Sequence, residues 1–451
     1  MRVTVIGCGH LGATHAAGMA EIGHEVIGVD VAPDKIDMLS QGRAWFHEPG
    51  LDELLSRHTA SGRLRFTTDF AEAASFGEVH FLGVGTPGLA DRPAYDTSQL
   101  RAAVRSLAPH LTKGCVIVGK STVSVGTTAW VTDLVHELAP AGEQVEVSWN
   151  PEFLREGLGV QDTLRPDRLV VGVASPAAEK TLRAVYQPLI DSGVPLVVCD
   201  PETAELVKSA ANAFLTTKIS FINAIAELCE AAGADVEALT RALSLDDRIG
   251  GKSLHAGLGY GGGCLPKDTR ALIARAEDLG VDEAVQLLRT VDGINEGRRA
   301  RIVDIVTELL GGSVARRRIT VWGASFKPNT DDIRDSPALD VAAQLYEAGA
   351  VVTCYDPQAI DNARVKHPEL VFADSAVEAA HGAEVVVLAT EWPEFTHLAP
   401  QEVSSVVTQP VIVDARNALP LVSWQSAGWQ VRRMGAALDV THDAPPAETP
   451  E

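Results

Sequence analysis

Cys264 is the residue whose surroundings point most directly to chemistry. It follows a glycine-rich run at residues 257–263, and Lys267 and Asp268 come shortly after it. A thiolate is a strong nucleophile, and a helix N-terminus or a nearby cation lowers the pKa of a thiol. The sequence after Pro266 has the pattern of a helix start, so we expect Cys264 to be activated. An inert buried cysteine is the alternative that this local sequence leaves open.

A second set of residues predicts a dinucleotide site near the N-terminus. Gly7, Gly9 and Gly12 follow the apolar run 3–6 and precede a helical pattern. Such glycines permit a tight turn, close approach of a pyrophosphate and packing of helix on strand. Asp30 ends the next strand, where a carboxylate binds ribose hydroxyls and repels a 2′-phosphate, which favours NAD over NADP. A hydride acceptor and a cysteine in one chain suggest oxidation of a carbonyl through a thioester.

Three further segments could line a site. Lys208 and Asn212 are one helical turn apart, so they share a face on which a cation and an amide could stabilise an oxyanion. A solvated lysine is the alternative. Residues 150–157 follow a strand-like run, and composition does not decide between a site loop and a connecting loop. Residues 326–336 also follow a strand; their cations could hold a nucleotide phosphate or pair with neighbouring acids in a structural turn.

The pattern of the chain indicates two sheets that would position these residues. Before residue 200, short apolar runs alternate with helical stretches, and we expect parallel strands at 3–6, 25–29, 79–84, 116–119 and 169–173. Residues 203–232 contain no proline or glycine and predict one long helix, followed by more helical sequence to about residue 310. Later strands are expected at 318–323, 351–356, 384–389 and 411–414. The predicted fold class is α/β, with two Rossmann-like parallel-sheet domains joined by a central long helix and a helical region.

Composition excludes several classes of function. Acidic residues number 60 and basic residues 38, a net charge of −22, which argues against binding nucleic acid or an anionic membrane. We expect no membrane span and no signal peptide, because no apolar run is long enough and the chain opens into a strand. The six cysteines form no C-x-x-C pair. We therefore expect no disulfide framework, no metal site and a cytoplasmic location.

Together these motifs resemble the UDP-glucose/GDP-mannose dehydrogenase family over almost the whole chain. The resemblance also rests on Gly85-Thr86-Pro87, Lys120-Ser121-Thr122-Val123, Pro166-Asp167-Arg168 and Asp247-Arg248-Ile249-Gly250. It implies an NAD-binding domain at 1–200, a central helical dimerisation region with the cysteine loop at 201–310, a UDP-sugar-binding domain at 311–440 and a disordered tail at 441–451. It also implies a homodimer.

The resemblance implies a twofold oxidation of the C6 hydroxyl of a nucleotide sugar, with two molecules of NAD. The sequences at 259–262 and 329–334 favour UDP-glucose as substrate and UDP-glucuronate as product. GDP-mannose, UDP-N-acetylglucosamine and UDP-N-acetylmannosamine are the alternatives. A non-catalytic sensor of NAD or of nucleotide sugars is an alternative from another class. The joint presence of Cys264, Lys208 and Asp268 argues against such a sensor.

The family's residue roles carry over to the matching positions. Cys264 is implied to attack the aldehyde, forming a thiohemiacetal and then a thioester, while Lys208 stabilises oxyanions. Water is positioned or activated by Asp268, Thr122, Glu152 and Asn212. Cofactor contacts are implied for Gly7, Gly9, Leu11, Gly12, Asp30, Lys35, Thr86, Thr122, Glu156, Lys267 and Arg334. Substrate contacts are implied for Glu152, Phe153, Leu154, Arg155, Glu156, Lys208, Asn212, Ser253, Leu254, His255, Ala256, Gly257, Gly261 and Lys327, with Arg248 reaching a partner subunit's site.

Four features depart from the family's usual sequence. His10-Leu11 replaces Tyr-Val, Ser124 replaces a proline, and Gly263 replaces a serine before the cysteine. The fingerprint glycines are retained, so we expect NAD binding to persist, whereas Gly263 removes a hydroxyl near the thiol. Residues 88–96 also differ from the usual segment, and the sequence alone offers no explanation of them.

Overall fold

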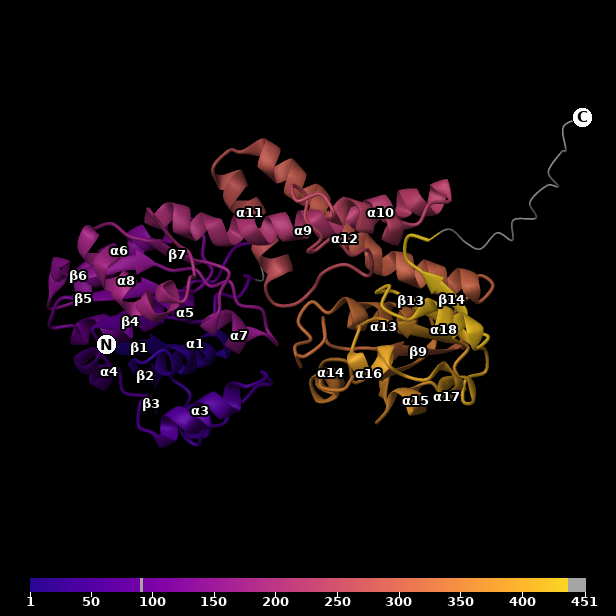
Figure 1. The fold of residues 1–451 in the computed structure, drawn as a ribbon, viewed down its shortest axis with the longest axis horizontal. Coiled ribbons are helices and arrows are strands. Elements are labelled where there is room, and N and C mark those ends of the chain that lie inside the picture. Colours follow the sequence, from indigo (N-terminus) through magenta and orange to yellow (C-terminus); the bar gives the residue numbers. More distant parts are fainter. Residues whose placement is uncertain (90–91, 437–451) are drawn as a thin grey trace, which may run out of the picture. The chain divides into compact units, whose positions relative to one another are not determined.

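The computed structural model describes residues 1–89 and 92–436, which form two compact units (Figure 1). Of the described residues, the first unit comprises those within 1–214, 263–288 and 329–331, and the second comprises 215–262, 289–328 and 332–436. Two long helices, α9 (Pro201–Ala232) and α12 (Asp282–Leu309), each begin in the first unit and end in the second. The disordered tail predicted at 441–451 lies outside the described residues.

An eight-stranded sheet forms the centre of the first unit, with strand order β3-β2-β1-β4-β5-β6-β7-β8. Its strands are β1 (Arg2–Ile6), β2 (Glu25–Val29), β3 (Leu64–Thr67), β4 (Val79–Leu82), β5 (Cys115–Gly119), β6 (Val145–Trp149), β7 (Leu169–Gly172) and β8 (Leu196–Cys199). Neighbours pair in parallel except β6 and β7, which meet antiparallel at Trp149 and Gly172. The predicted sheet is confirmed, whereas β3, β8 and the reversal at β7 were not predicted.

Helices cover both faces of this sheet because alternate strand residues point to opposite sides. Val3 and Val5 of β1 pack with the helices of one face, and Ile27 and Val29 of β2 pack with those of the other. The first face carries α1 (His10–Glu21), α2 (Pro33–Ser40), α3 (Leu51–Ala60), α7 (Gly159–Leu164) and α8 (Pro176–Asp191). The second carries α4 (Phe70–Phe76), α5 (Ser98–Leu107), the 3₁₀ turn at Ala108–His110 and α6 (Thr127–Leu138).

The helical middle follows the sequence prediction. Helix α9 begins at Pro201, where proline fits the first turn, and the Asp200 carboxylate accepts hydrogen bonds from the Thr203 amide and hydroxyl. The helix ends at Ala232, before Gly233 with a φ of +74°. Three more helices complete this region, namely α10 (Val236–Ser244), α11 (Leu265–Asp278) and α12.

A six-stranded parallel sheet forms the centre of the second unit, with strand order β11-β10-β9-β12-β13-β14. Its strands are β9 (Arg318–Trp322), β10 (Val351–Tyr355), β11 (Val371–Phe372), β12 (Val385–Leu388), β13 (Val411–Asp414) and β14 (Gln430–Arg433). Its shorter helices are α13 (Pro337–Glu347), α14 (Ile360–Lys366), α15 (Ala376–Ala379), α16 (Pro393–Thr396), α17 (Pro400–Ser404) and α18 (Leu421–Ser426). The four predicted strands are confirmed, and the short strands β11 and β14 were not predicted.

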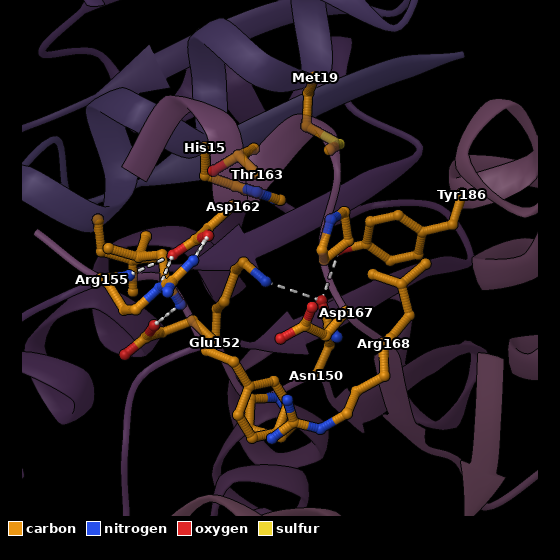
Figure 2. Close-up of a pocket in the computed structure, with 17 residues that line it drawn as sticks. His15, Met19, Asn150, Glu152, Arg155, Asp162, Thr163, Asp167, Arg168 and Tyr186 are labelled. Carbon is orange, nitrogen blue, oxygen red and sulfur yellow. Dashed lines mark hydrogen bonds and ion pairs between the residues drawn. The ribbon is translucent and has the colours of Figure 1, made fainter. Parts of the chain in front are cut away.

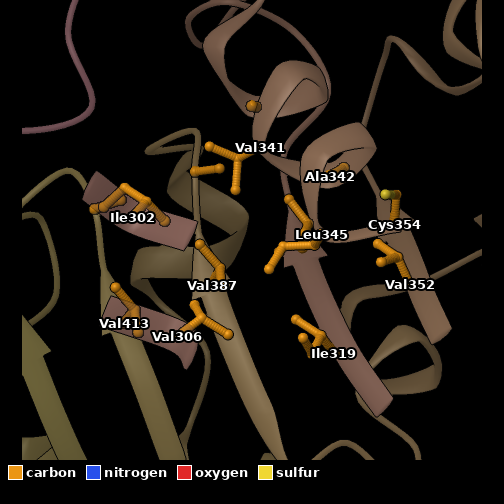
Figure 3. Packing of buried hydrophobic residues seen from close by; sticks show 14 of the residues in the cluster. Ile302, Val306, Ile319, Val341, Ala342, Leu345, Val352, Cys354, Val387 and Val413 are labelled. Atoms are coloured by element: carbon orange, nitrogen blue, oxygen red, sulfur yellow. The ribbon is translucent and has the colours of Figure 1, made fainter. Parts of the chain in front are cut away.

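The two faces of the second sheet have different cores. Figure 3 shows Ile302 and Val306 of α12 and Leu345 of α13 packed against aliphatic residues of the strands. Among the residues that the structure describes, the opposite face contains six buried aromatic residues, including Trp322 and Phe395, which stack at 5.6 Å between ring centroids. Burial on both faces explains why these strands read as continuous apolar runs in the sequence.

Candidate active site

The glycine fingerprint forms a tight loop between β1 and α1. Gly7 has a φ of +91°, and its amide donates to the Val29 carbonyl at 2.7 Å. A Cβ at Gly12 would overlap the Gly7 carbonyl oxygen, so only glycine lets α1 pack this closely. A Cβ at Gly9, the N-cap residue of α1, would have no protein atom within 4 Å. This space faces the unpaired amides of the helix N-terminus and fits a pyrophosphate.

Asp30 lies directly after β2, beside the fingerprint loop. Its carboxylate accepts hydrogen bonds from the Cys8 amide at 2.9 Å and the Ala32 amide at 3.0 Å. These two contacts leave further acceptor positions on the carboxylate for ribose hydroxyls. Nearby, the Lys35 ammonium lies 4.4 Å from the centre of the Trp45 ring, whose indole donates to the Cys8 carbonyl at 3.4 Å. The donor and acceptor groups needed for a dinucleotide are therefore in place.

Cys264 is the N-cap residue of α11 and is exposed to solvent. The helix begins at Leu265, as the sequence around Pro266 predicted. Exposure lets a substrate reach the residue, although the protein around the sulfur removes most of the water that would stabilise a thiolate. Burial of the sulfur, followed by the negative charges of Glu152 and Asp268, raises the pKa of the thiol to about 11.

The predicted lowering of this pKa is therefore wrong for the protein without bound ligands. Lys267, the expected cationic neighbour, pairs with Asp268 at 2.7 Å instead. Lys208 is the cation that acts to lower the pKa of Cys264, but desolvation and the carboxylates outweigh it. The cysteine thus rests mainly as a neutral thiol near neutral pH, and thiolate formation requires added positive charge or proton transfer.

Lys208 and Asn212 project into the same site from α9. The Lys208 ammonium lies 3.1 Å from a Glu152 carboxylate oxygen. Burial acts to lower the pKa of Lys208, but Glu152, and then Cys264 and Asp268, hold it above its usual value. The side chain is therefore a charged donor at neutral pH rather than a proton acceptor, which suits stabilisation of an oxyanion.

Asp268 is fully buried within a set of hydrogen-bond donors. Its Oδ2 accepts from the Asn212 amide at 2.6 Å, and its Oδ1 accepts from Lys267 at 2.7 Å and from the Tyr95 hydroxyl at 2.9 Å. Sequence reasoning placed Asn212 and Asp268 in one site, and the structure brings them into contact. It missed Tyr95, since nothing in the sequence relates a loop near residue 90 to a helix 173 positions later.

The loop at 150–157 is anchored at its first residue. Asn150 Oδ1 accepts from Lys120 at 3.0 Å and from Tyr186 at 2.5 Å, and its amide donates to the Val170 carbonyl at 2.7 Å. Burial lowers the pKa of Lys120 to about 8, while Glu152 acts in the opposite direction. Lys120, Asn150 and Tyr186 line a cavity of about 70 Å³. Figure 2 shows Asn150 and Tyr186 along this cavity, together with Glu152. Such anchoring favours the interpretation of a site loop over a connecting loop.

Glu48 fastens the far end of the same loop. Its buried carboxylate accepts from the Gly157 and Gly159 amides at 2.8 Å each and lies 2.9 Å from His10 of the fingerprint. Arg155 of the loop pairs with Asp162 of α7, as Figure 2 shows. Glu48 was not predicted as a site residue. The signal that the sequence offered was its position just before Pro49-Gly50, a pair typical of a turn.

The glycine run before Cys264 is tightly packed rather than flexible. A Cβ would clash with Asn295 at Gly259 and with the Asp335 carbonyl at Gly261. The Tyr260 amide donates to Asn295 at 2.8 Å, and the Gly257 amide donates to Asn223 at 2.8 Å. These glycines therefore allow close approach of neighbouring chain segments.

The predicted nucleotide-sugar residues of the second unit lie around this run. Leu254, Ala256 and Gly257 are buried, His255 is exposed, and Ser253 has a φ of +64°. Arg416, which was not predicted, donates from its guanidinium to the Gly259, Ala389 and Phe326 carbonyls. Its position shortly after β13 was the signal in the sequence that could have identified Arg416, because loops after parallel strands often contact ligands.

Two predicted basic residues form ion pairs with acids two positions before them in the sequence. Arg334 forms an ion pair with Asp332 at 2.6 Å, in agreement with the structural-turn alternative for residues 326–336. Arg248 pairs with Asp246, and its side chain is 89% exposed. Exposure of this kind leaves Arg248 accessible to another molecule.

Models of one family match three segments of the chain. Residues 1–190 match the NAD binding domain of the UDP-glucose/GDP-mannose dehydrogenase family, residues 202–297 its central domain and residues 320–420 its UDP binding domain. The chain belongs to this family. The predicted resemblance, the dehydrogenase class and NAD as the cofactor are thereby confirmed, and the chemistry that NAD supplies when bound is acceptance of hydride.

Individual relatives extend over nearly the full length. UDP-glucose 6-dehydrogenase of Rhizobium meliloti is 44% identical over 419 residues, which are 92% of this chain and 95% of the relative. UDP-glucose 6-dehydrogenase YwqF of Bacillus subtilis is 38% identical, covering 96% and 98% respectively. The solved UDP-glucose dehydrogenase of Pyrobaculum islandicum has a TM-score of 0.89 at 36% identity and covers 97% of this chain and 98% of that structure.

Family membership explains why the second sheet differs from the first in its ligand chemistry. Asp356 follows β10, as Asp30 follows β2, but its carboxylate is fully buried. It accepts hydrogen bonds from the Ala324 and Ser325 amides, the Ser325 hydroxyl and the Trp392 indole, and on its other oxygen from the Gln358 and Ala359 amides. A carboxylate used in this way lacks the free acceptor positions that Asp30 keeps for ribose hydroxyls.

Across residues 1–89 and 92–436, no helix is long and apolar enough to cross a membrane. Within the same ranges, no group of three or more His, Cys, Asp or Glu side chains could hold a metal ion.

Two fingerprint glycines give a matched pair of tests. We expect Gly9→Ala to fold normally, because its Cβ meets no protein atom, but to raise the Kd for NAD at least about tenfold by occupying the pyrophosphate space. We expect Gly12→Ala to lose about 2 kcal/mol of stability or more, because its Cβ overlaps the Gly7 carbonyl. Thermal unfolding and NAD titration measure both effects. Equal NAD affinity in Gly9→Ala and wild type would contradict this assignment.

Proposed function

We propose that this chain is a UDP-glucose 6-dehydrogenase that oxidises UDP-glucose twice with NAD to UDP-glucuronate. The observation that carries the chemistry is the arrangement of Lys208, Asn212 and Asp268 with Cys264 in the unit that holds the glycine fingerprint. The choice of UDP-glucose rests on full-length relatives of that name at 36–44% identity. Solved UDP-N-acetylmannosamine dehydrogenases are less similar, at 25–27% identity.

In the first oxidation, the C6 hydroxyl loses its proton and C6 loses a hydride, which leaves an aldehyde. The Lys208 ammonium donates to the oxygen as negative charge develops there. Its elevated pKa supports this role. A water held by Asp268 accepts the hydroxyl proton.

In the second oxidation, the Cys264 sulfur forms a bond to the aldehyde carbon, and the thiol proton ends on the new hydroxyl oxygen. The product is a thiohemiacetal, an alcohol-like centre that can lose a second hydride. Loss of that hydride and of the hydroxyl proton gives a thioester. Lys208 again stabilises the oxygen, because it lies on the same site.

Water then cleaves the thioester. The water oxygen bonds to the carbonyl carbon, the carbon–sulfur bond breaks, and Cys264 regains its proton while the uronate leaves. We assign Asp268, with Asn212, Glu152 and Thr122, to hold and activate this water. The hydrogen bond between Asn212 and Asp268 and the ion pair between Lys208 and Glu152 support a shared role.

The remaining roles follow the family pattern. The cofactor and substrate contacts assigned above keep those roles in the proposal, with Glu156 contributing to both. We retain an NAD-binding domain at 1–200, a central region at 201–310 and a UDP-sugar-binding domain at 311–440. Packing of the glycine run and the position of Arg416 support a nucleotide-sugar site near residues 253–261.

We further propose a cytoplasmic homodimer. Phe214, Phe221 and Leu228 are exposed on α9 at seven-residue intervals, an apolar stripe suited to association with a second copy. The exposed Arg248 would reach the partner's site. All six cysteines are free, which supports a reducing compartment.

A substrate panel tests the proposed reaction. UDP-glucose, GDP-mannose, UDP-N-acetylglucosamine and UDP-N-acetylmannosamine are each supplied with NAD, and the NADH formed per sugar consumed is measured. Two NADH per UDP-glucose is the expected result. One NADH with aldehyde release would exclude the thioester mechanism. Faster turnover of another sugar nucleotide would make that nucleotide the assigned substrate. Absence of turnover with all four would favour a non-catalytic sensor.

A further inference from the structure

Tyr95 makes two contacts to the catalytic segment that the mechanism above does not use. It lies in the stretch 88–96, which departs from the family's usual sequence. The ends of this stretch are held together: Gly88 and Tyr95 form an antiparallel bridge, and the Asp96 amide donates to the Pro87 carbonyl at 2.7 Å. The Leu89 amide also donates to the Ala94 carbonyl at 2.8 Å. Tyr95 lies against the first turn of α11, where it contacts Lys267 and Asp268.

The hydroxyl of Tyr95 donates to Asp268. Its oxygen lies 2.9 Å from Asp268 Oδ1, and both side chains are buried. Burial, followed by the negative charge of Asp268, holds the pKa of the Tyr95 phenol well above its usual value. The phenol therefore stays protonated near neutral pH, so its hydroxyl remains a donor to Asp268.

The ring of Tyr95 carries the second contact. The Lys267 ammonium lies 4.5 Å from the ring centre, a cation–π distance, while also donating to Asp268 Oδ1 at 2.7 Å. One side chain thus holds both members of the Lys267–Asp268 pair.

These contacts limit how Asp268 can accept water. A carboxylate offers about four acceptor positions. Tyr95 and Lys267 occupy those of Oδ1, and Asn212 occupies one of Oδ2. The position that remains is on Oδ2, beside Asn212, and a water bound there is directed by the donors on the other oxygen.

We propose that Tyr95 is a positioning residue that orients the Asp268 carboxylate through its hydroxyl and the Lys267 ammonium through its ring. The proposal rests on the proposed dehydrogenase function. It assigns Tyr95 an effect on turnover through Asp268 and an effect on NAD affinity through Lys267.

Charged groups also surround the Asp268 carboxylate. Lys267 faces it from α11 and Lys208 from α9, and Cys264 and Glu152 share the site. Tyr95 adds a neutral donor to this set. Without the Tyr95 hydroxyl, Lys267 remains as the donor to Oδ1, and one contact fewer orients the carboxylate.

Tyr95→Phe removes the hydroxyl and keeps the ring. We expect kcat to fall about tenfold and the KM for NAD to change less than about twofold. Tyr95→Leu removes both contacts and is expected to raise the KM for NAD about fivefold in addition. Tyr346→Phe, at an exposed tyrosine of α13, is the matched control.

A fluorinated residue covers the case in which Tyr95→Phe folds poorly. Incorporation of 3-fluorotyrosine at position 95 keeps the shape and makes the hydroxyl a stronger donor, so kcat should change at least about twofold while the melting temperature and the KM for NAD do not change. Unchanged kcat in both variants would overturn the proposal, as would a fall in kcat with an equal rise in the KM for NAD in Tyr95→Phe. Wild-type turnover of UDP-glucose is measured alongside, because its absence would count against the function rather than against Tyr95.

Discussion

Cys264→Ser and Cys264→Ala should abolish net formation of UDP-glucuronate, with a loss of at least about 10³-fold in its rate. The first hydride transfer does not need the sulfur, so some NADH and aldehyde can still form. The ratio of NADH to sugar consumed should therefore fall from two toward one. Quantifying NADH together with aldehyde and uronate in a single reaction gives this ratio directly.

The physical reason is that an aldehyde is a poor hydride donor until a nucleophile adds to its carbon. The thiol makes that addition and then serves as a leaving group in hydrolysis, whereas a serine alkoxide is far less accessible and an alanine has no nucleophile. Cys199→Ser, at a half-buried cysteine that ends β8, is the matched control and should keep normal stoichiometry. Uronate formed at a near-normal rate by Cys264→Ala would remove Cys264 from its assigned role.

Lys208→Met is expected to lower kcat by about 10² to 10³-fold, because a preorganised donor to the developing oxyanion is lost. The thiol should respond too, since Lys208 is the group that acts to lower the pKa of Cys264. Iodoacetamide should therefore alkylate Cys264 more slowly in the variant at pH 8 to 9. Mass spectrometry of the Cys264 peptide measures this rate.

Two controls separate these effects from loss of folding. Lys180→Met changes an exposed lysine on α8 and should alter neither rate. Thermal unfolding of Lys208→Met shows whether the unpaired Glu152 carboxylate destabilises the protein. If alkylation is unchanged or faster while kcat falls, Lys208 does not act on the thiol, and only its oxyanion role survives.

Much of the fold was accessible from local patterns. The strands around Gly7 and Asp30 and the long helix beginning near residue 201 follow from apolar runs, from glycine and proline positions and from the absence of helix breakers. Such signals are local, so a single sequence contains them. The strands that were missed, β3, β8, β11 and β14, lie at the edges of the two sheets and are only partly buried. They therefore lack the fully buried apolar run that marks the central strands.

The identities of many site residues could be predicted from the sequence, but the contacts between them could not. Lys208 and Asn212 were placed together because helical geometry relates positions four apart. The contacts of Tyr95 and Glu48 join segments more than a hundred residues apart, and no local rule connects them. The pKa of Cys264 was predicted in the wrong direction because desolvation depends on the whole surrounding structure and not on the adjacent Lys267.

The internal hydrogen bonding of Asp356 has a consequence for binding stoichiometry. Both sheets contain the strand order of dinucleotide-binding proteins, so counting sheets would give two equivalents of NAD per chain. Only Asp30 keeps acceptor capacity for a ribose, because the backbone amides and the indole saturate Asp356. A calorimetric titration should therefore saturate at one equivalent of NAD per chain. Two sheets with the same strand order can thus provide a single dinucleotide site when the carboxylate of one sheet is fully hydrogen-bonded within its own unit.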